Sequence, residues 1–323
     1  MIDEDLDKCD EQARLGYELR LVTNMSTEIE TELSASTDID ISNTLRQYLS
    51  AIFTDHAHDV DLSFYDTKGD SLRLYHDEHI MDASQASYAL NLPKRQYMHL
   101  AAANIIDNEL VDLADDEWCH KSLLRQVSSD TIPSHTTGLF TARQSMDILE
   151  GVDQQFNVHL YMANCAAALV VDTQGHDAGH LKVFSTGFAT GYSICDSLYH
   201  YAAVAPIVRT TVLTPDKGSK MAFCSVTFPS QRTVASRTVI EDADRFKTVP
   251  GQRPLWSFRA YFTNADGTVT ETILGINEPL LPGELKIIQV KLADDGSLTS
   301  ESPEVSVSVT LDWKQGTIFT PGI

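Results

Sequence analysis

The chain repeats one local pattern almost from end to end: short runs of alternating apolar and polar residues, separated by turns that bring Asp or Asn close to Gly. A period of two places the apolar side chains on one face of an extended strand. Glycine supplies the positive φ that tight turns between antiparallel strands require. The turns are DTKGD (66–70), DTQG (172–175), NADGT (264–268) and ADDGS (293–297), and the runs are Leu15–Val22, Val60–Tyr65, Ser87–Leu92, Gln96–Ala103, Met221–Phe228, Leu255–Phe262, Val269–Leu274, Leu285–Leu292 and Val305–Leu311. The pattern predicts a mainly β, antiparallel fold.

A longer run, QQFNVHLYMANCAAALVVDT (154–173), lies in mid-chain. Its first half alternates, and Cys165–Val171 is apolar on both faces, as in a strand that enters a buried region. The three alanines favour a helix, but the flanking β-branched and aromatic residues do not, and neither end carries a helix stop signal. We therefore predict a long β element here.

Helical signals are few. Ile41–Phe53 has Ser42 as a candidate N-cap and an apolar stripe, which predicts a helix of about three turns. A short helix is predicted over Ile106–Leu113. The polar, proline-containing or proline-flanked stretches Ser122–Thr137 and Ser230–Arg253 are predicted to be exposed loops.

At 323 residues the chain exceeds the usual size of one hydrophobic core, which favours two domains. We place the boundary near Leu149–Asp153, giving domains 1–150 and 151–323. A weak internal repeat supports this division: in residues 91–103 and 280–292 a Leu-Pro pair is followed, after a tight turn, by an alternating strand.

The charge excludes some classes of partner. The chain has 46 Asp plus Glu against 24 Lys plus Arg, a formal charge of -22, which repels phosphate backbones and anionic membrane surfaces. We expect no nucleic-acid partner. No apolar run reaches the roughly 20 residues that span a bilayer, and the acidic start MIDEDLDKCD is unlike a signal peptide. We expect a soluble chain whose export signal, if it has one, is not part of this sequence.

The five cysteines are scattered, with no C-x-x-C pair, so no structural zinc site is predicted. Cys165 and Cys224 lie in apolar runs and are expected to pack as small buried hydrophobes. Cys9, in the acidic N-terminal arm, is the best candidate for a disulfide in an oxidising compartment; its partner cannot be assigned from the sequence.

No motif predicts catalysis or a cofactor. The histidine clusters HAHD (56–59), HDEH (76–79) and HDAGH (176–180) do not match H-E-x-x-H on a helix, and we expect solvated histidines at strand ends and no metal site. The acidic arm lacks the glycine and closing Glu of a calcium loop. G-x-S-x-G, the P-loop and G-x-G-x-x-G are all absent. We predict a protein that is not an enzyme.

Several short motifs follow one another in order: DLDKC (5–9), RLGYELRLV (14–22), IFTDHAHDVDLSFYDTKGDSL (52–72) and LPKRQYMHLAAAN (92–104), then GLF (138–140), the mid-chain run and LDW (311–313). This order resembles the Bacteroidales fimbrillin superfamily, FimB/Mfa type. One position departs from the family pattern, because Arg95 stands where the family usually has a turn glycine.

The resemblance implies two transthyretin-like (Greek-key) antiparallel β-sandwich domains with few short helices. It also implies that the mid-chain run is the first strand of the second sandwich. Proteins of this family are exported, carry a lipid on a cysteine after the signal peptide, and serve as minor, tip or anchor subunits of fimbriae at the outer membrane. Asp7 and Lys8 are unlike the residues that precede a lipidated cysteine, so Cys9 is not that residue. Any lipidated residue is expected upstream of Met1.

The leading functional hypothesis is a non-enzymatic structural or adhesive subunit of a cell-surface fimbria, assembled with other fimbrial subunits by β-strand complementation. The alternative is an outer-membrane glycan-binding lipoprotein, in which Trp118, Trp256 or Trp313 would stack on sugar rings, although burial is the better expectation for each. A hydrolase with two catalytic carboxylates is a remote third class.

The cleanest alternation in the chain lies in EVSVSVTLDW (304–313). Val305, Val307 and Val309 share a face with Leu311 and Trp313, and we expect this strand to close the second sandwich. The tail that follows is then free to bind a partner. Its apolar residues, Ile318, Phe319 and Ile323, are the predicted partner-binding residues.

Overall fold

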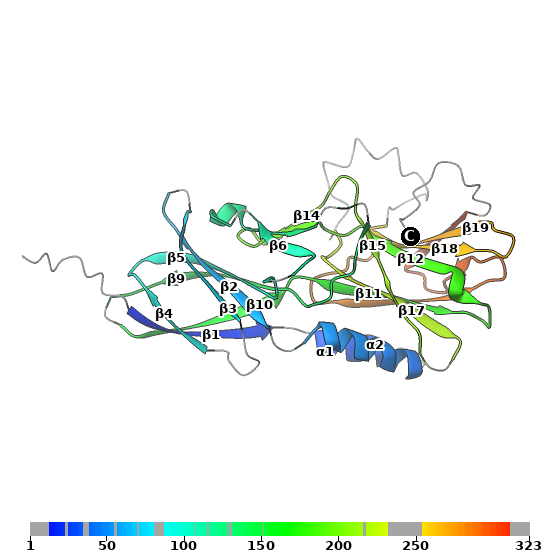
Figure 1. The fold of residues 1–323 in the computed structure, drawn as a ribbon, viewed down its shortest axis with the longest axis horizontal. Coiled ribbons are helices and arrows are strands. Elements are labelled where there is room, and N and C mark those ends of the chain that lie inside the picture. Colours follow the sequence, from blue (N-terminus) through cyan, green and yellow to red (C-terminus); the bar gives the residue numbers. More distant parts are fainter. Residues whose placement is uncertain are drawn as a thin grey trace, which may run out of the picture.

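The structure is a computed structural model. It describes residues 13–22, 25–34, 39–54, 57–69, 71–80, 87–106, 108–114, 116–127, 129, 131–150, 152–215, 218–231 and 254–310. These residues form an elongated molecule in which strands greatly outnumber helices (Figure 1). The predicted mainly β fold is therefore confirmed.

The first sheet has seven strands in the order β3-β2-β5-β9-β10-β1-β4. It occupies one end of the molecule (Figure 1). Its strands are β1 (Ala13–Val22), β2 (Asp59–Asp66), β3 (Arg73–Ile80), β4 (Ser87–Leu92), β5 (Gln96–Ala103), β9 (Phe140–Asp147) and β10 (Gln154–Met162). Most neighbours are antiparallel, but β1 runs parallel to β10, so the sheet is mixed.

Two further sheets face each other at the opposite end. The second sheet comprises β16 (Thr211–Leu213), β17 (Lys220–Thr227), β11 (Cys165–Asp172), β20 (Leu285–Leu292) and β21 (Leu298–Thr299), in that order. The third comprises β22 (Val305–Thr310), β19 (Val269–Ile276), β18 (Trp256–Thr263), β12 (Leu181–Thr186), β15 (Ile207–Arg209) and β8 (Thr131–Ile132). Buried side chains from both, among them Leu169, Phe223, Phe258 and Leu274, form one core between them. This is a β-sandwich.

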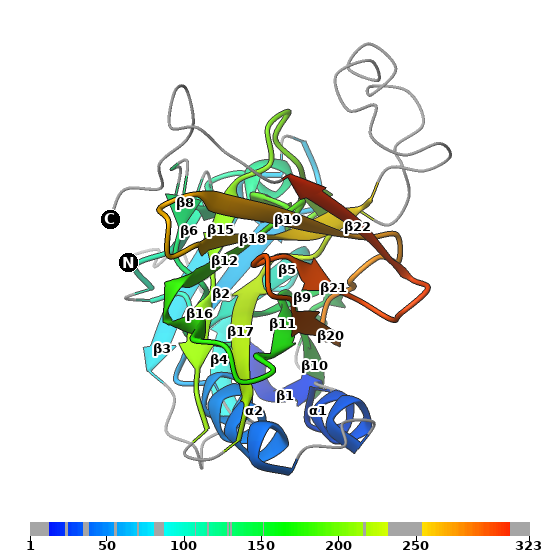
Figure 2. The ribbon, with the colours of Figure 1, turned by 90° about the vertical axis from the view of Figure 1, so that its right-hand side faces the viewer.

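Two helices cover the outer face of the second sheet, α1 (Met25–Ser34) and α2 (Ile39–Ile52) (Figure 2). Leu45 and Leu49 of α2 share a core with Ala168 and Cys224 of that sheet. The predicted helix 41–53 is confirmed, but it begins at Ile39, so Ser42 lies inside it and is not its N-cap. Neither of these described helices is long and apolar enough to cross a bilayer.

The fourth sheet is small and takes strands from both halves of the chain. Its order is β14-β13-β7-β6, with β6 (Val111–Ala114), β7 (Leu123–Gln126), β13 (Gly191–Ser193) and β14 (Leu198–His200). Short 3-10 turns precede β7 (η2, Cys119–Lys121) and β12 (η3, Ala178–His180). A third core joins this sheet to the first, through residues such as Leu100, Leu124 and Ile194.

Two predictions for residues 106–137 are wrong, because this part of the chain forms the strands β6, β7 and β8. The short helix over 106–113 is wrong, because the Asn108 carboxamide oxygen accepts hydrogen bonds from the N–H groups of Leu110 and Val111 and starts strand β6 instead. The exposed loop over 122–137 is also wrong. That stretch contains β7 and β8, with Leu124 and Ile132 buried, because these few apolar residues add to cores supplied mainly by other segments.

The mid-chain run is two strands rather than one. β10 belongs to the first sheet and β11 to the second, and the chain passes between them at Ala163 and Asn164. The fully buried Asn164 side chain fixes this passage: it accepts from the Leu139 N–H at 3.2 Å and donates to the Thr137 carbonyl at 3.0 Å. Of this run, only β11 belongs to the sandwich, and the short strand β8 of the third sheet precedes it in the chain. The division of the chain near residue 150 stays a prediction.

All four predicted turns contain a glycine in the left-handed region: Gly69, Gly175, Gly267 and Gly296 have φ between 70° and 87°. The predicted hairpin or loop tips are confirmed in this respect, although 172–175 joins β11 to a strand of another sheet and is a loop. In the repeated Leu-Pro segment, Gly283 has a φ of 76°, whereas Arg95 is not among the described residues with positive φ. The turn at Arg95 thus has a conformation that needs no glycine.

Candidate functional site

Strand β20 is paired along nearly its whole length on one side but only at its C-terminal end on the other. On the first side it pairs with β11 in parallel, from Ala166↔Leu285 to Asp172↔Lys291. On the open side β21 pairs only with its last two residues, Lys291 and Leu292. Among the described residues no strand pairs with the open side from Leu285 to Val290.

The direction of the backbone groups follows from the register. The Ala166 N–H donates to the Glu284 carbonyl, and in a parallel ladder alternate residues bond the same neighbour. Even-numbered residues of β20 therefore bond β11, and the N–H and C=O groups of Leu285, Ile287 and Gln289 point to the open side. One of these groups has a weak contact, because the Ile287 N–H lies 3.4 Å from a carboxylate oxygen of Glu32 on α1.

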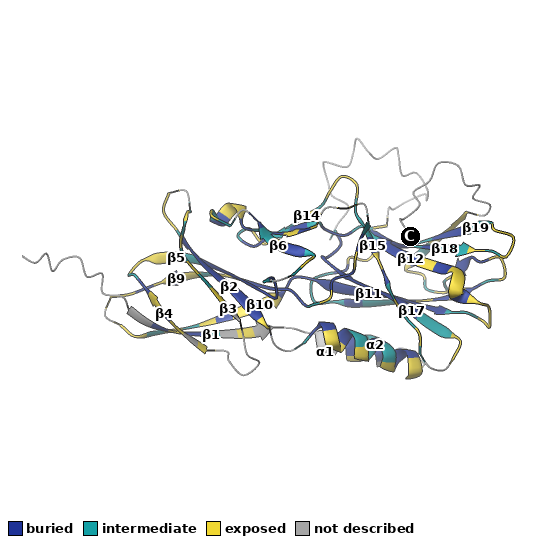
Figure 3. Cartoon of the chain, in the orientation of Figure 1, coloured by how far each residue is buried: buried dark blue, intermediate teal, exposed yellow. Residues whose placement is uncertain are grey.

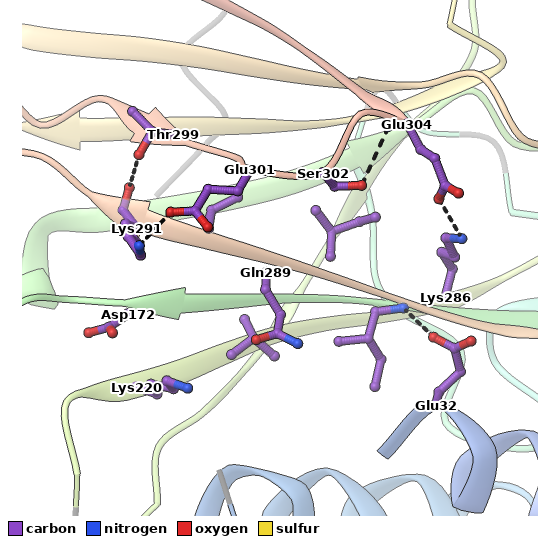
Figure 4. A pocket seen from close by; sticks show the side chains of 14 residues that line it. Glu32, Asp172, Lys220, Lys286, Gln289, Lys291, Thr299, Glu301, Ser302 and Glu304 are labelled. Atoms are coloured by element: carbon purple, nitrogen blue, oxygen red, sulfur yellow. Dashed lines mark hydrogen bonds and ion pairs between the residues drawn. The ribbon is translucent and has the colours of Figure 1, made fainter. Parts of the chain in front are cut away.

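The open edge borders a groove of about 330 Å³ (Figure 4). Lys286 bridges Glu278 and Glu304 at 2.9 and 3.1 Å, and Lys291 contacts Glu301 at 2.6 Å. The lining combines an apolar floor with charges of both signs: Glu32, Val170, Asp172, Lys220, Lys286, Ile287, Ile288, Gln289, Val290, Lys291, Thr299, Glu301, Ser302 and Glu304. Lysine and glutamate pairs of this kind screen an edge strand from unspecific pairing.

The third sheet also ends in an edge strand, β22, which pairs with β19 and with no other described strand. Val305 is buried, but Val307 is 39% and Val309 41% exposed. The expectation that these valines close the second sandwich is therefore wrong for Val307 and Val309, which are exposed, and holds for Val305. The tail residues Ile318, Phe319 and Ile323, and Leu311 and Trp313, lie outside the described residues.

One histidine cluster is more than a solvated strand end. His76 on β3 is hydrogen-bonded to the Asp61 carboxylate at 2.6 Å, and Asp116 lies within reach, so that ligand atoms of the three residues fall within 4.8 Å of one another. Burial raises the pKa of Asp61. Arg73 forms an ion pair with Asp116. The cluster thus brings two carboxylates, a histidine and an arginine together on and beside strands β2 and β3.

The two described tryptophans, Trp118 and Trp256, offer little surface for stacking on a ligand. Trp256 is buried, and its indole N–H donates to the Glu278 carbonyl at 2.9 Å. Trp118 is half-buried beside the Lys121 ammonium, which lies 5.9 Å from the ring centroid. A second hollow, of about 250 Å³, is lined by Tyr161, Tyr192 and Arg143, and Tyr161 is 57% exposed.

Sequence reasoning recognised Leu285–Leu292 as a strand but not as an open edge. Alternation reveals which residues face the core, whereas edge position depends on pairing with segments far away in the chain. One signal was present: KIIQVK (286–291) has a lysine at each end of an apolar strand, which is typical of edge strands.

No protein-family model and no curated protein sequence matches the chain. Solved structures do. A candidate polysaccharide-binding protein from Bacteroides thetaiotaomicron is 10% identical, with a TM-score of 0.55 over 95% of this chain and 100% of that one. A candidate adhesin from Bacteroides ovatus is 12% identical, with a TM-score of 0.55 over 95% and 97%. Another, from B. thetaiotaomicron, is 9% identical, with a TM-score of 0.54 over 92% and 96%. The chain therefore shares the β-sandwich fold of these Bacteroides proteins.

Proposed function

We propose that this protein is a non-enzymatic structural or adhesive subunit of a cell-surface fimbria, and that a β-strand from a neighbouring subunit completes the open edge of β20. The open edge is the observation that carries the proposal. The fold supports it, because solved structures with this fold include proteins named as candidate adhesins. The proposal places the protein outside the cell, at the outer membrane.

The edge offers a strand both hydrogen bonds and an apolar surface. Leu285, Ile287 and Gln289 point their N–H and C=O groups outward, and each backbone hydrogen bond to an added strand contributes about 1 kcal/mol net. The half-buried Ile287 side chain gives that strand an apolar contact. Addition of a strand to a sheet edge is an established mode of peptide recognition. The partner is therefore an extended segment of another subunit.

The C-terminal tail of this chain is the segment that we assign to the reciprocal contact. Ile318 and Phe319 are adjacent apolar residues after the last described strand, and Ile323 follows four residues later. Deletion of 316–323 is expected to leave the melting temperature unchanged and to reduce incorporation into fimbriae. If the shortened protein unfolds or assembles at the wild-type level, the tail has no role in binding a partner.

The edge itself is tested by Gln289→Pro. Proline removes a backbone N–H that points to the open side and pairs with no described strand, and it is tolerated in edge strands where that N–H faces solvent. The matched control is Gln289→Thr, which changes the side chain but keeps the N–H. Both proteins are expected to fold, with melting temperatures within a few degrees of each other.

We expect Gln289→Pro to abolish co-purification with neighbouring subunits and incorporation into fimbriae, and Gln289→Thr to retain both. Equal incorporation of the two variants would rule out strand addition at β20. If Gln289→Pro does not fold, Gln289→Cys replaces it, and a disulfide between this cysteine and a cysteine scanned along the neighbour's strand measures proximity directly.

Glycan binding is the second candidate function. The observation in its favour is the exposed Tyr161 ring beside Tyr192 and Arg143, since an aromatic face and a guanidinium are suited to sugar rings and hydroxyl groups. A structure with this fold is also named as a candidate polysaccharide-binding protein. Tyr161→Ala should then abolish retention of bacterial or host polysaccharides, with no effect on assembly into fimbriae.

A further inference from the structure

Two cysteine sulfur atoms lie next to each other between the first and fourth sheets. Cys119 belongs to the 3-10 turn η2 that precedes β7, and Cys195 lies in the turn between β13 and β14. Their Sγ atoms are 2.8 Å apart. This is closer than the usual contact of two non-bonded sulfur atoms and longer than the S–S bond of about 2.05 Å.

The backbone already holds the two positions together. β7 and β13 are hydrogen-bonded neighbours, with Leu123 opposite Ser193. The Ile194 N–H donates to the Ser122 carbonyl at 3.1 Å, and the Cys119 N–H donates to the Ser71 carbonyl at 2.9 Å. The sulfur atoms therefore need to move less than about 1 Å to reach bonding distance, with no change in strand register.

From this geometry we infer that Cys119 and Cys195 form an intramolecular disulfide when the folded chain meets a disulfide oxidant. The inference does not rest on the fimbrial role, because the pair is fixed by the fold. The oxidant is a protein or small molecule that itself carries a disulfide. In the first step the Cys195 thiolate attacks one oxidant sulfur, and one oxidant thiol leaves.

In the second step the Cys119 thiol loses its proton and attacks the Cys195 sulfur, which releases the second oxidant thiol. The pair loses two electrons and two protons, and the oxidant disulfide becomes two thiols. Cys195 reacts first because it is only half-buried, whereas Cys119 is 3% exposed. Burial raises the pKa of the Cys119 thiol, which disfavours the thiolate form. The short distance between the two sulfur atoms favours its attack on the Cys195 sulfur.

The other described cysteines cannot form this bond with each other. Cys165 belongs to the core between the second and third sheets, and Cys224 to the core under the helices, so they lie on opposite faces of one sheet. Both are buried. They provide matched controls, since they are thiols in the same protein with no sulfur neighbour among the described residues.

The disulfide joins residues 76 positions apart and links the two parts of the chain that build the fourth sheet. β6 and β7 precede the proposed division near residue 150, and β13 and β14 follow it. A cross-link over a loop of this length restricts the unfolded chain strongly. Oxidation should therefore raise the melting temperature by on the order of 10 °C.

The test uses the full chain with Cys9→Ser, which removes the cysteine outside the described residues. Folded protein is incubated with oxidised glutathione, quenched with acid, alkylated under denaturing conditions and mapped by mass spectrometry. We expect one cross-linked peptide pair, Cys119 with Cys195, with Cys165 and Cys224 still alkylated. We also expect a melting temperature that falls when the protein is reduced.

Cys119→Ser in the same background should leave a stable mixed disulfide of glutathione on Cys195 and abolish the redox shift in melting temperature. Cys224→Ser should keep both the cross-link and the shift. The inference is overturned if Cys119 and Cys195 are still alkylated, under the denaturing conditions, after the folded protein has reached equilibrium with the oxidant. It is equally overturned if the protein that retains Cys119 accumulates a stable mixed disulfide between glutathione and Cys195.

Discussion

Two histidine side chains, His99 and His135, lie completely inside the protein, and burial lowers the pKa of each to about 4. The hydrogen bonds of His99 fix its tautomer. Its Nδ1 donates to the Ser63 carbonyl at 3.0 Å, so Nε2 is the acceptor for the Tyr17 hydroxyl at 2.5 Å. His135 packs edge-on against Phe228, and its Nε2 has no hydrogen-bond partner among the described residues. Both rings are therefore held neutral.

These histidines predict a loss of stability in mild acid. Above pH 6.5 the ring is neutral in both the folded and the unfolded chain. Below pH 6.5 each histidine takes up a proton in the unfolded chain, whereas in the folded chain it stays neutral down to about pH 4. The free energy of unfolding should thus fall between pH 6.5 and 4, by at most about 3 kcal/mol for each histidine. Urea unfolding at a series of pH values measures this slope.

His135→Leu should remove the part of the slope that belongs to His135. The substitution also removes the buried nitrogen that lacks a partner, so the variant should be as stable as the wild type at pH 7 or more stable. His159→Leu, at an exposed position on β10, is the control and should keep the full slope. A wild-type slope in His135→Leu would contradict the assignment.

Gly187 is a position where a side chain has no room. Its φ is +103°, and an added Cβ would lie 2.6 Å from the Trp256 Cα and 2.7 Å from the Leu255 carbonyl oxygen. Gly187→Ala should therefore destabilise the sandwich by about 3 kcal/mol or more, through strain and backbone displacement. The control is Gly175→Ala, where φ is +87° but no atom lies within 4 Å of the added Cβ. It should cost only the strain of about 1 to 2 kcal/mol. Equal losses in chemical denaturation would show that the close approach is relieved elsewhere.

The two helices act as a cover for the second sheet rather than as independent elements. Leu49 of α2 is fully buried, in the core that contains Cys224 and Val226 of β17. Leu49→Ala should destabilise the protein by about 2 to 5 kcal/mol, since it removes apolar contacts and leaves a cavity. Gln47→Ala, on the exposed side of the same helix, should change stability by less than about 0.5 kcal/mol. Thermal unfolding of both variants tests this, and a small loss for Leu49→Ala would mean that the helices are loosely docked.

Elements whose signals are local were predictable from the sequence. The period-two runs and the Asp-Gly or Asn-Gly turns mark β5, β17 and β19 and the hairpin between β18 and β19, because alternation and positive φ are properties of a few neighbouring residues. The apolar stripe of α2 is equally local. Each of these was predicted within a few residues of its observed bounds.

Elements that depend on distant partners were not predictable. β6 and β7 have four residues each and are strands only because they pair with each other and with β13. The break at Asn164 depends on hydrogen bonds to residues 137 and 139. The centre of the candidate site is the open edge of β20. It is open because no described strand pairs with it from Leu285 to Val290. A pattern in one segment carries no information about such an absence.

The two ends of the molecule share three structural elements. β10 follows residue 150 but lies between β9 and β1 of the first sheet. The helices precede residue 150 but cover the second sheet, and the fourth sheet takes two strands from each side. Each half thus supplies part of the other half's core. Pulling the two ends apart must therefore break β pairing and a buried core together.

The same sharing predicts how the chain unfolds and where it can be cut. The full chain should show one cooperative thermal transition. A fragment of residues 1–150 lacks β10, so its first sheet is interrupted between β9 and β1 and should not fold cooperatively. A fragment of residues 1–164 restores β10 and should regain strand content and protection from proteolysis, though with α1 and α2 uncovered and a tendency to associate. Calorimetry and limited proteolysis of the three proteins distinguish these states. Two separate transitions in the full chain, or a well-folded 1–150 fragment, would show that the halves are independent domains and that the shared strand contributes little.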